Sequence, residues 1–179
     1  MACTITDGKS RPDCPGETPG AKDTFYLFNT DEVASYTETA LDVVSNITFD
    51  AGKGLYQVVA KKGSVEARWE QQDNDTGATD YTHEIDFRDV DLSAAAIYWG
   101  KSLDGVSLGC IVHTKGGKFL LYGKNDGLRK AVHNGTTNAD ELGQFFTLRE
   151  TQVDEPPRPF LSSDEESTLT LIGSKIVGS

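Results

Sequence analysis

Residues 80–123 constrain the fold more than any other part of this chain, because they predict four elements in close succession. In residues 81–87, Tyr, His, Ile and Phe alternate with Thr, Glu and Asp. This period of two is typical of a strand with one dry face and one wet face. Residues 106–114 and 118–122 predict two further strands, joined by a tight Lys-Gly-Gly turn.

Between the first two of these strands, residues 92–103 predict a short helix. An alanine run gives it high helix propensity, and Asp91 is placed to cap its first turn. Leu92, Ala96, Trp99 and Leu103 recur at helical spacing and form one apolar stripe. Because a two-stranded hairpin is not stable alone in water, we expect the helix and the strands to pack against one another.

Similar patterns on either side predict a mainly β fold. Residues 64–71 and 143–153 alternate cleanly between apolar and polar side chains, and residues 55–61 predict another strand. We expect residues 55–87 to form a long hairpin with its tip at residues 72–79. The fold class predicted is two packed antiparallel sheets, sandwich- or barrel-like, with one short flanking α-helix and extended terminal arms.

The domain organisation follows from proline-rich segments near both ends. Residues 1–23 hold three of the six prolines and show no periodicity, so they predict an N-terminal arm. Residues 24–155 form the predicted β-sandwich domain. The prolines of residues 156–159 then break the sheet, and residues 156–179 predict a C-terminal arm that contains one more apolar strand at residues 169–172.

Charge and composition exclude several classes of function. The 179 residues carry a formal net charge of −11, which opposes binding to nucleic-acid phosphates and to anionic membranes. No apolar run approaches the roughly 20 residues that a membrane helix needs. Residues 1–6 lack the basic and apolar regions of a secretory signal, so we expect folding in a cytoplasm.

The sequence contains no convincing catalytic or metal-binding constellation. Its three histidines lack the spacing of metal ligands, and Cys110 and His113 would lie on opposite faces of one strand. Cys3 and Cys14 could form a disulfide, but three reduced thiols are the simpler expectation. We therefore expect a protein that is not an enzyme and that needs neither metal nor cofactor.

The order of elements from Tyr81 to Val153 resembles the tail tube proteins of tailed bacteriophages. The resemblance rests on the alternating strand, the short helix, Gly109-Cys110-Ile111-Val112-His113-Thr114, the run from Gly117 to Leu128 and Phe145-Phe146-Thr147-Leu148-Arg149-Glu150-Thr151. It implies six copies in a ring, and stacked rings that form the tube through which DNA leaves the capsid. It also implies a location in the virion tail, assembly in the host cytoplasm and partners such as terminator, tape measure or sheath proteins.

Two sets of site residues follow from that resemblance. Glu66, Glu70, Glu84 and Asp86 are candidates for the lumen, where like charge would let DNA pass without being bound. The candidates for contacts between rings are Asp73, Asn74, Asp75, Thr76, Phe160 and Leu161. The alternative is that the acidic residues simply face solvent.

Other functions remain open from the sequence alone. A capsid-decorating, head–tail joining or baseplate protein would share this composition but form a small closed oligomer. A carbohydrate- or protein-binding sandwich would expose aromatic side chains at loop tips. Trp69 and Trp99 instead lie on faces that the pattern predicts to be buried, which argues against such a sandwich.

Overall fold

The computed structural model describes residues 19–39, 42–73, 79–138 and 141–177, and it confirms a mainly β fold. The strands are β1 (Ala21–Asn29), β2 (Val33–Glu38), β3 (Val44–Phe49), β4 (Tyr56–Val59), β5 (Glu66–Asp73), β6 (Thr79–Asp89), β7 (Leu108–Thr114), β8 (Phe119–Tyr122), β9 (Arg129–Thr136), β10 (Gly143–Val153) and β11 (Arg158–Pro159). Two α-helices, α1 (Ala94–Ser102) and α2 (Glu165–Ser174), and a 3₁₀ turn, η1 (Thr30–Glu32), complete the secondary structure.

The strands form two packed sheets and a separate hairpin. A five-stranded sheet has the order β11-β8-β7-β1-β4, and a four-stranded sheet has the order β5-β6-β10-β9. Strands β2 and β3 form a two-stranded sheet, and an isolated parallel bridge joins Val44 of β3 to Phe160. Every pairing between these named strands is antiparallel.

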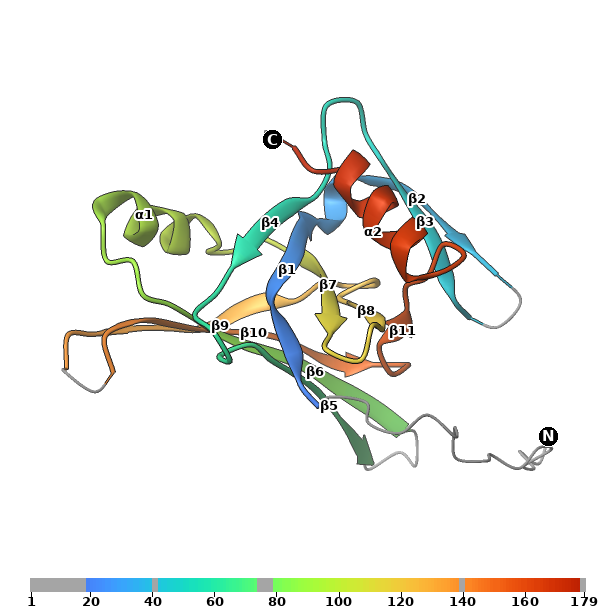
Figure 1. Cartoon of the computed structure of the whole chain (residues 1–179). Helices are drawn as coiled ribbons and strands as arrows, with labels where there is room; N and C mark the ends of the chain where they lie inside the picture. The colour runs from blue at the N-terminus through green and yellow to red at the C-terminus, as the bar shows by residue number, and fades with distance from the viewer. Residues whose placement is uncertain (1–18, 40–41, 74–78, 139–140, 178–179) are drawn as a thin grey trace.

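The five-stranded sheet is the middle layer of three (Figure 1). The four-stranded sheet covers one of its faces, and a first apolar core that includes Phe25, Ile85 and Phe146 fills the space between them. The β2–β3 hairpin and α2 cover the other face, over a second core that includes Phe28, Ile47 and Ile172. Strand β7 is buried on both faces as a result, because Cys110 and Val112 face the first core and Ile111 faces the second.

Helix α1 confirms the predicted stripe but begins two residues later than predicted, at Ala94. Leu92, Ala96, Trp99 and Leu103 are the less exposed positions of this segment. The cap is Ser93 rather than Asp91, since the Ser93 hydroxyl accepts from the backbone N–H of Ala96. Asp91 instead accepts from the backbone N–H and the hydroxyl of Ser93.

The predicted hairpin over residues 55–87 is only half right. Strands β5 and β6 do pair along their lengths, from Glu66 opposite Asp86 to Asp73 opposite Thr79. Strand β4 pairs with β1 in the other sheet, so the turn around Gly63 carries the chain from one sheet to the other. The alternation of residues identifies a strand, but it does not identify the strand's partner.

The predictions for the two ends of the body also need correction. Residues 165–174 form α2 rather than a strand, so the described residues contain two flanking helices and not one. The C-terminal segment belongs to the body, because β11 pairs with β8 and Ile172 is buried in the second core. At the other end, residues 21–23 belong to β1 and not to an arm. Cys3 and Cys14 lie outside the described residues.

Candidate assembly surfaces

All four acidic lumen candidates lie on one surface, the outer face of the four-stranded sheet. Glu66 is opposite Asp86, and Arg68 is opposite Glu84, in the β5–β6 register. Glu70 is two residues further along β5 on the same face. Their neighbours on the inner face, such as Ile85 and Phe87, are buried in the first core. The structure therefore places these four side chains together, on the side of the sheet that faces away from the core.

Glu84 is not the open carboxylate that the sequence suggested. Its side chain is only 8% exposed and lies between the guanidinium groups of Arg68 on β5 and Arg149 on β10, which bind one carboxylate oxygen each. Arg68 also binds Asp86 at 2.7 Å and approaches Glu66 at 3.3 Å. The centre of this face is a network of paired charges, because neighbouring strands bring basic side chains to both sides of Glu84.

The solvent-exposed negative charges of this face lie on β5, which is the edge strand of the sheet. Glu66 and Glu70 are exposed, whereas Asp86 is half-buried and also accepts from the Thr147 hydroxyl at 2.6 Å. The acidic face predicted from the sequence is thus a network in which Glu84 and Asp86 pair with two arginines. The two exposed glutamates lie beside this network on β5. A single strand's alternation could not reveal this, since both arginines come from other strands.

The candidate contact residues between rings fall into three groups. Asp73 is exposed at the end of β5, and Asn74, Asp75 and Thr76 lie outside the described residues. Phe160 is 1% exposed and packs in the second core, where its N–H donates to the Phe119 carbonyl at 3.0 Å. Phe160 is therefore not available to another copy, because the second core needs its ring. Leu161 is exposed beside it.

The four-stranded sheet has two different open edges. In the described part of the chain, β5 pairs only with β6, and β9 pairs only with β10. Each edge presents a row of backbone N–H and C=O groups that another strand could bind. An apolar groove of about 560 Å³ runs beside β5, between Ala67 and Trp69 on that strand and Leu120 and Tyr122 on β8.

The two tryptophans differ in their surroundings. Trp99 packs edge-to-face against Phe87 and Phe146, at ring distances of 6.4 and 5.7 Å, so its prediction as a packed residue is confirmed. The prediction for Trp69 is wrong, because 47% of that side chain is exposed at the groove. Trp69 does lie on the inner side of β5, but β5 is the last strand of its sheet and the five-stranded sheet does not cover it fully.

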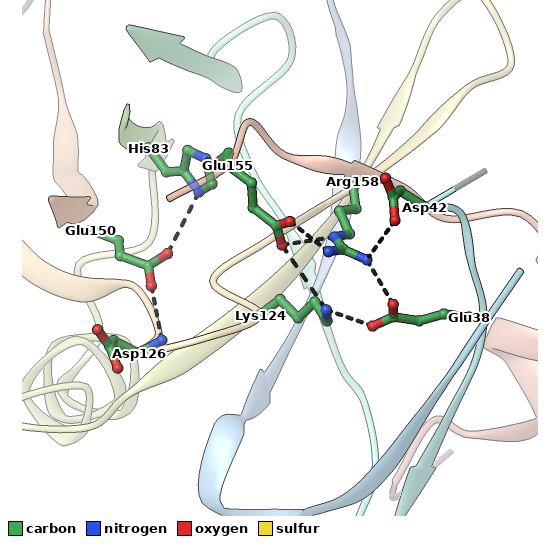
Figure 2. Close-up of polar contacts among 8 residues, drawn as sticks. All are labelled: Glu38, Asp42, His83, Lys124, Asp126, Glu150, Glu155 and Arg158. Atoms are coloured by element: carbon green, nitrogen blue, oxygen red, sulfur yellow. Dashed lines mark hydrogen bonds and ion pairs between the residues drawn. The ribbon is translucent and has the colours of Figure 1, made fainter. Parts of the chain in front are cut away.

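A cluster of polar side chains joins the C-terminal segment to the body (Figure 2). Arg158 binds Glu155 at 2.5 Å and Glu38 at 2.8 Å, and Lys124 binds Glu38 at 2.6 Å. These contacts hold β11 against β2 and the turn that follows β8. The pKa of Arg158 is raised, chiefly by its hydrogen bond to Glu155, so this guanidinium stays charged.

Beside this cluster lies a buried pair, His83 and Glu150 (Figure 2). Glu150 accepts from the backbone N–H groups of Asp126 and Gly127, both at 3.0 Å, and its other oxygen is 3.5 Å from His83 Nδ1. Burial, and then the negative charge of Glu150, raise the pKa of Tyr36 to about 12. The adjoining cavity measures about 10 Å³, which is room for one water molecule and not for a substrate.

The thiol of Cys110, another group that could be reactive, is also buried. Burial raises the pKa of the Cys110 thiol well above its ordinary value, so Cys110 is a packed side chain and not a nucleophile. Cys110 faces the first core, whereas His113 lies on the opposite face of β7 near α2, as predicted. Among the described residues, no group of three or more His, Cys, Asp or Glu side chains could hold a metal ion.

No described helix is long and apolar enough to cross a membrane. The distinctive features of the described residues are two open strand edges, a charged sheet face and an apolar groove. Comparison of the chain with family models, with curated proteins and with solved structures found no match.

Proposed function

We propose that this protein is a self-assembling virion structural protein, and that its stacked rings form a phage tail tube through which DNA is ejected. The observation that supports this proposal best is the four-stranded sheet β5-β6-β10-β9. It has a charged outer face that carries Glu66, Glu70, Glu84 and Asp86, and its two edges are different strands. The resemblance of residues 81–153 to tail tube proteins points the same way.

The two different edge strands of this sheet suit the assembly of copies into a closed ring. A ring needs a head-to-tail contact, in which one patch on each copy binds a second, different patch on the next copy. Strands β5 and β9 supply two such patches at opposite sides of one sheet. Joined edge to edge, the sheets of all copies would form a continuous wall with their cores on the outside, and the charged faces would line the lumen.

The charge arrangement suits passage of DNA without binding. Arg68 and Arg149 are held by Glu84, so neither is free to bind a phosphate group firmly. Glu66 and Glu70 add exposed negative charge, which repels the DNA backbone.

Negative-stain electron microscopy of concentrated protein, with its elution volume from a sizing column, tests assembly. We expect uniform rings or stacked tubes. Val132→Asp, on the edge strand β9, should abolish them, whereas Val59→Asp, on β4 of the other sheet, should not; both valines are exposed. A small closed oligomer would favour a capsid-decorating, head–tail joining or baseplate protein. A monomer at every concentration would contradict self-assembly.

A second measurement addresses the lumen. The double variant Glu66→Lys, Glu70→Lys should still form tubes but should retain short DNA duplexes in a sedimentation assay, whereas wild-type tubes should not. In a second arm, the DNA is present while the tubes assemble, so that it can be enclosed in the lumen. If the variant tubes do not retain DNA in this arm either, Glu66 and Glu70 do not line the lumen.

A further inference from the structure

No side chain of the described residues fills the groove beside β5. Ala67 and Trp69 on β5, and Val65 just before that strand, line it on one side, and Val112 and Leu120 line it from the five-stranded sheet. Nearly half of the Trp69 side chain is exposed there. Large apolar side chains in an open groove are typical of a binding site for another segment of protein.

The edge of β5 lies directly along this groove. A strand that is added to that edge would satisfy its open backbone groups and would place every second side chain in the groove. The added strand would thus extend the sheet β5-β6-β10-β9 and close this side of the sandwich. The occupant should be extended and β-branched, with small or medium apolar side chains at alternate positions.

The chain itself enters the structure at this groove. Pro19, Gly20 and Ala21 line its mouth, and the Gly20 carbonyl accepts from the Lys115 N–H at 2.9 Å, which fixes the entry point. Eighteen residues precede Pro19 in the sequence, and fully extended they would span about 60 Å at ~3.3 Å each. The eight residues of β5 span only about 26 Å, so the preceding segment can reach all of that edge.

Residues 3–6 of that segment have the required pattern. They read Cys-Thr-Ile-Thr, so Cys3 and Ile5 would share one face of a strand, and Thr4 and Thr6 would share the other. Residues 7–18 contain two glycines and two prolines and are suited to a linker.

We propose that Cys3–Thr6 add to the open edge of β5 in the same chain, with Cys3 and Ile5 in the groove beside Trp69. Covalent connection at Pro19 favours this segment over the same segment of another copy, because a short tether gives an effective concentration on the order of millimolar. This inference does not rest on the assembly proposal, but it changes one part of it: with Cys3–Thr6 added to β5, the added strand and not β5 would be the sheet edge that meets β9 of the next copy.

Hydrogen exchange of the β5 amides in the full chain tests the added strand. Ile5→Asp places a charge in the groove, whereas Thr4→Asp places the same charge on the solvent side and is the matched control. We expect Ile5→Asp to accelerate exchange of the β5 amides that point away from β6 by at least about tenfold, with β10 unchanged and Thr4→Asp close to wild type. Equal exchange in all three proteins would overturn the proposal.

Cross-linking identifies which chain supplies the segment. In a Cys14→Ser background, Ala67→Cys or Val65→Cys should form a disulfide with Cys3 under mild oxidation, at the mass of a single chain; Thr37→Cys, exposed on β2, should not. Buried Cys110 is a poor competitor for oxidation. A bridge at the mass of two chains would assign the groove to another copy, and no bridge at either position would overturn the proposal.

Discussion

Phe28 and Gly109 are direct neighbours across the β1–β7 pair, and the ring of Phe28 occupies the space that a Cβ atom at position 109 would fill. Because Gly109 has no side chain, the ring of Phe28 can pack directly against the backbone of β7 in the second core. The close contact at this position therefore depends on the absence of a side chain at Gly109.

Gly109→Ala should destabilise the protein, because the added methyl group must displace the fully buried Phe28 ring. We expect the free energy of unfolding to fall by about 1–3 kcal/mol, as measured by urea denaturation. Gly135→Ala on β9 is the control, since nothing lies within 4 Å of its Cβ position, and it should change stability by less than about 0.5 kcal/mol. Equal effects of the two substitutions would contradict the close packing at Gly109.

Glu84→Gln should destabilise the outer face of the four-stranded sheet. It removes the negative charge between Arg68 and Arg149 while keeping the size of the side chain. We expect a loss of about 2 kcal/mol in the free energy of unfolding, because hydrogen bonds to a buried charge are strong. Glu66→Gln, whose side chain is 68% exposed, should cost less than about 1 kcal/mol. A similar cost for both would mean that burial of Glu84 does not strengthen its ion pairs.

Local patterns predicted much of the fold from sequence. The boundaries of β10 and the β7–β8 hairpin follow from alternation, an apolar run and a glycine turn, which are properties of neighbouring residues. The partner of β4 could not be predicted, because pairing with β1 depends on a distant part of the chain. The partners of Glu84 were missed for the same reason, since Arg68 and Arg149 come from two other strands.

Helix α2 did leave a signal in the sequence. Asp164 caps it by accepting from the Ser167 N–H at 2.7 Å, and Glu165 and Glu166 occupy its first turn, where negative charge favours a helix. Thr168 and Ile172, four residues apart, form its buried side. The apolar stretch over residues 169–172 suggested a strand, but the cap and the acidic first turn were the more reliable features.

The pKa of His113 should respond to Lys22. Burial, and then the Lys22 ammonium 3.0 Å from Nε2, lower this pKa below its ordinary value of 6.5, while Glu165 on the same nitrogen opposes the shift. The unfolded chain therefore takes up the proton at a higher pH than the folded chain. Stability from this group is present above about pH 6.5 and is lost as the pH falls through the folded pKa.

NMR titration of the His113 ring measures this directly. Lys22→Met should raise the pKa of His113, because it removes the repelling charge and leaves Glu165 in place. Lys62→Met, at an exposed turn position, is the control and should leave it unchanged. The Lys22 variant should also lose less stability than the wild type between about pH 7 and pH 5. No change in the His113 pKa would show that Lys22 does not act on the ring.

Ile172→Ala should loosen the whole C-terminal segment from the five-stranded sheet. Ile172 is 1% exposed in the second core, so truncation leaves a cavity beneath α2 and should cost about 2–4 kcal/mol by urea denaturation. Leu169→Ala is the matched control on the outer side of the same helix, where the side chain is 38% exposed, and it should cost less than about 1 kcal/mol. If residues 165–174 were only an arm, both substitutions would leave the unfolding of the body unchanged. A large cost for Ile172 alone would instead show that α2 is part of the body.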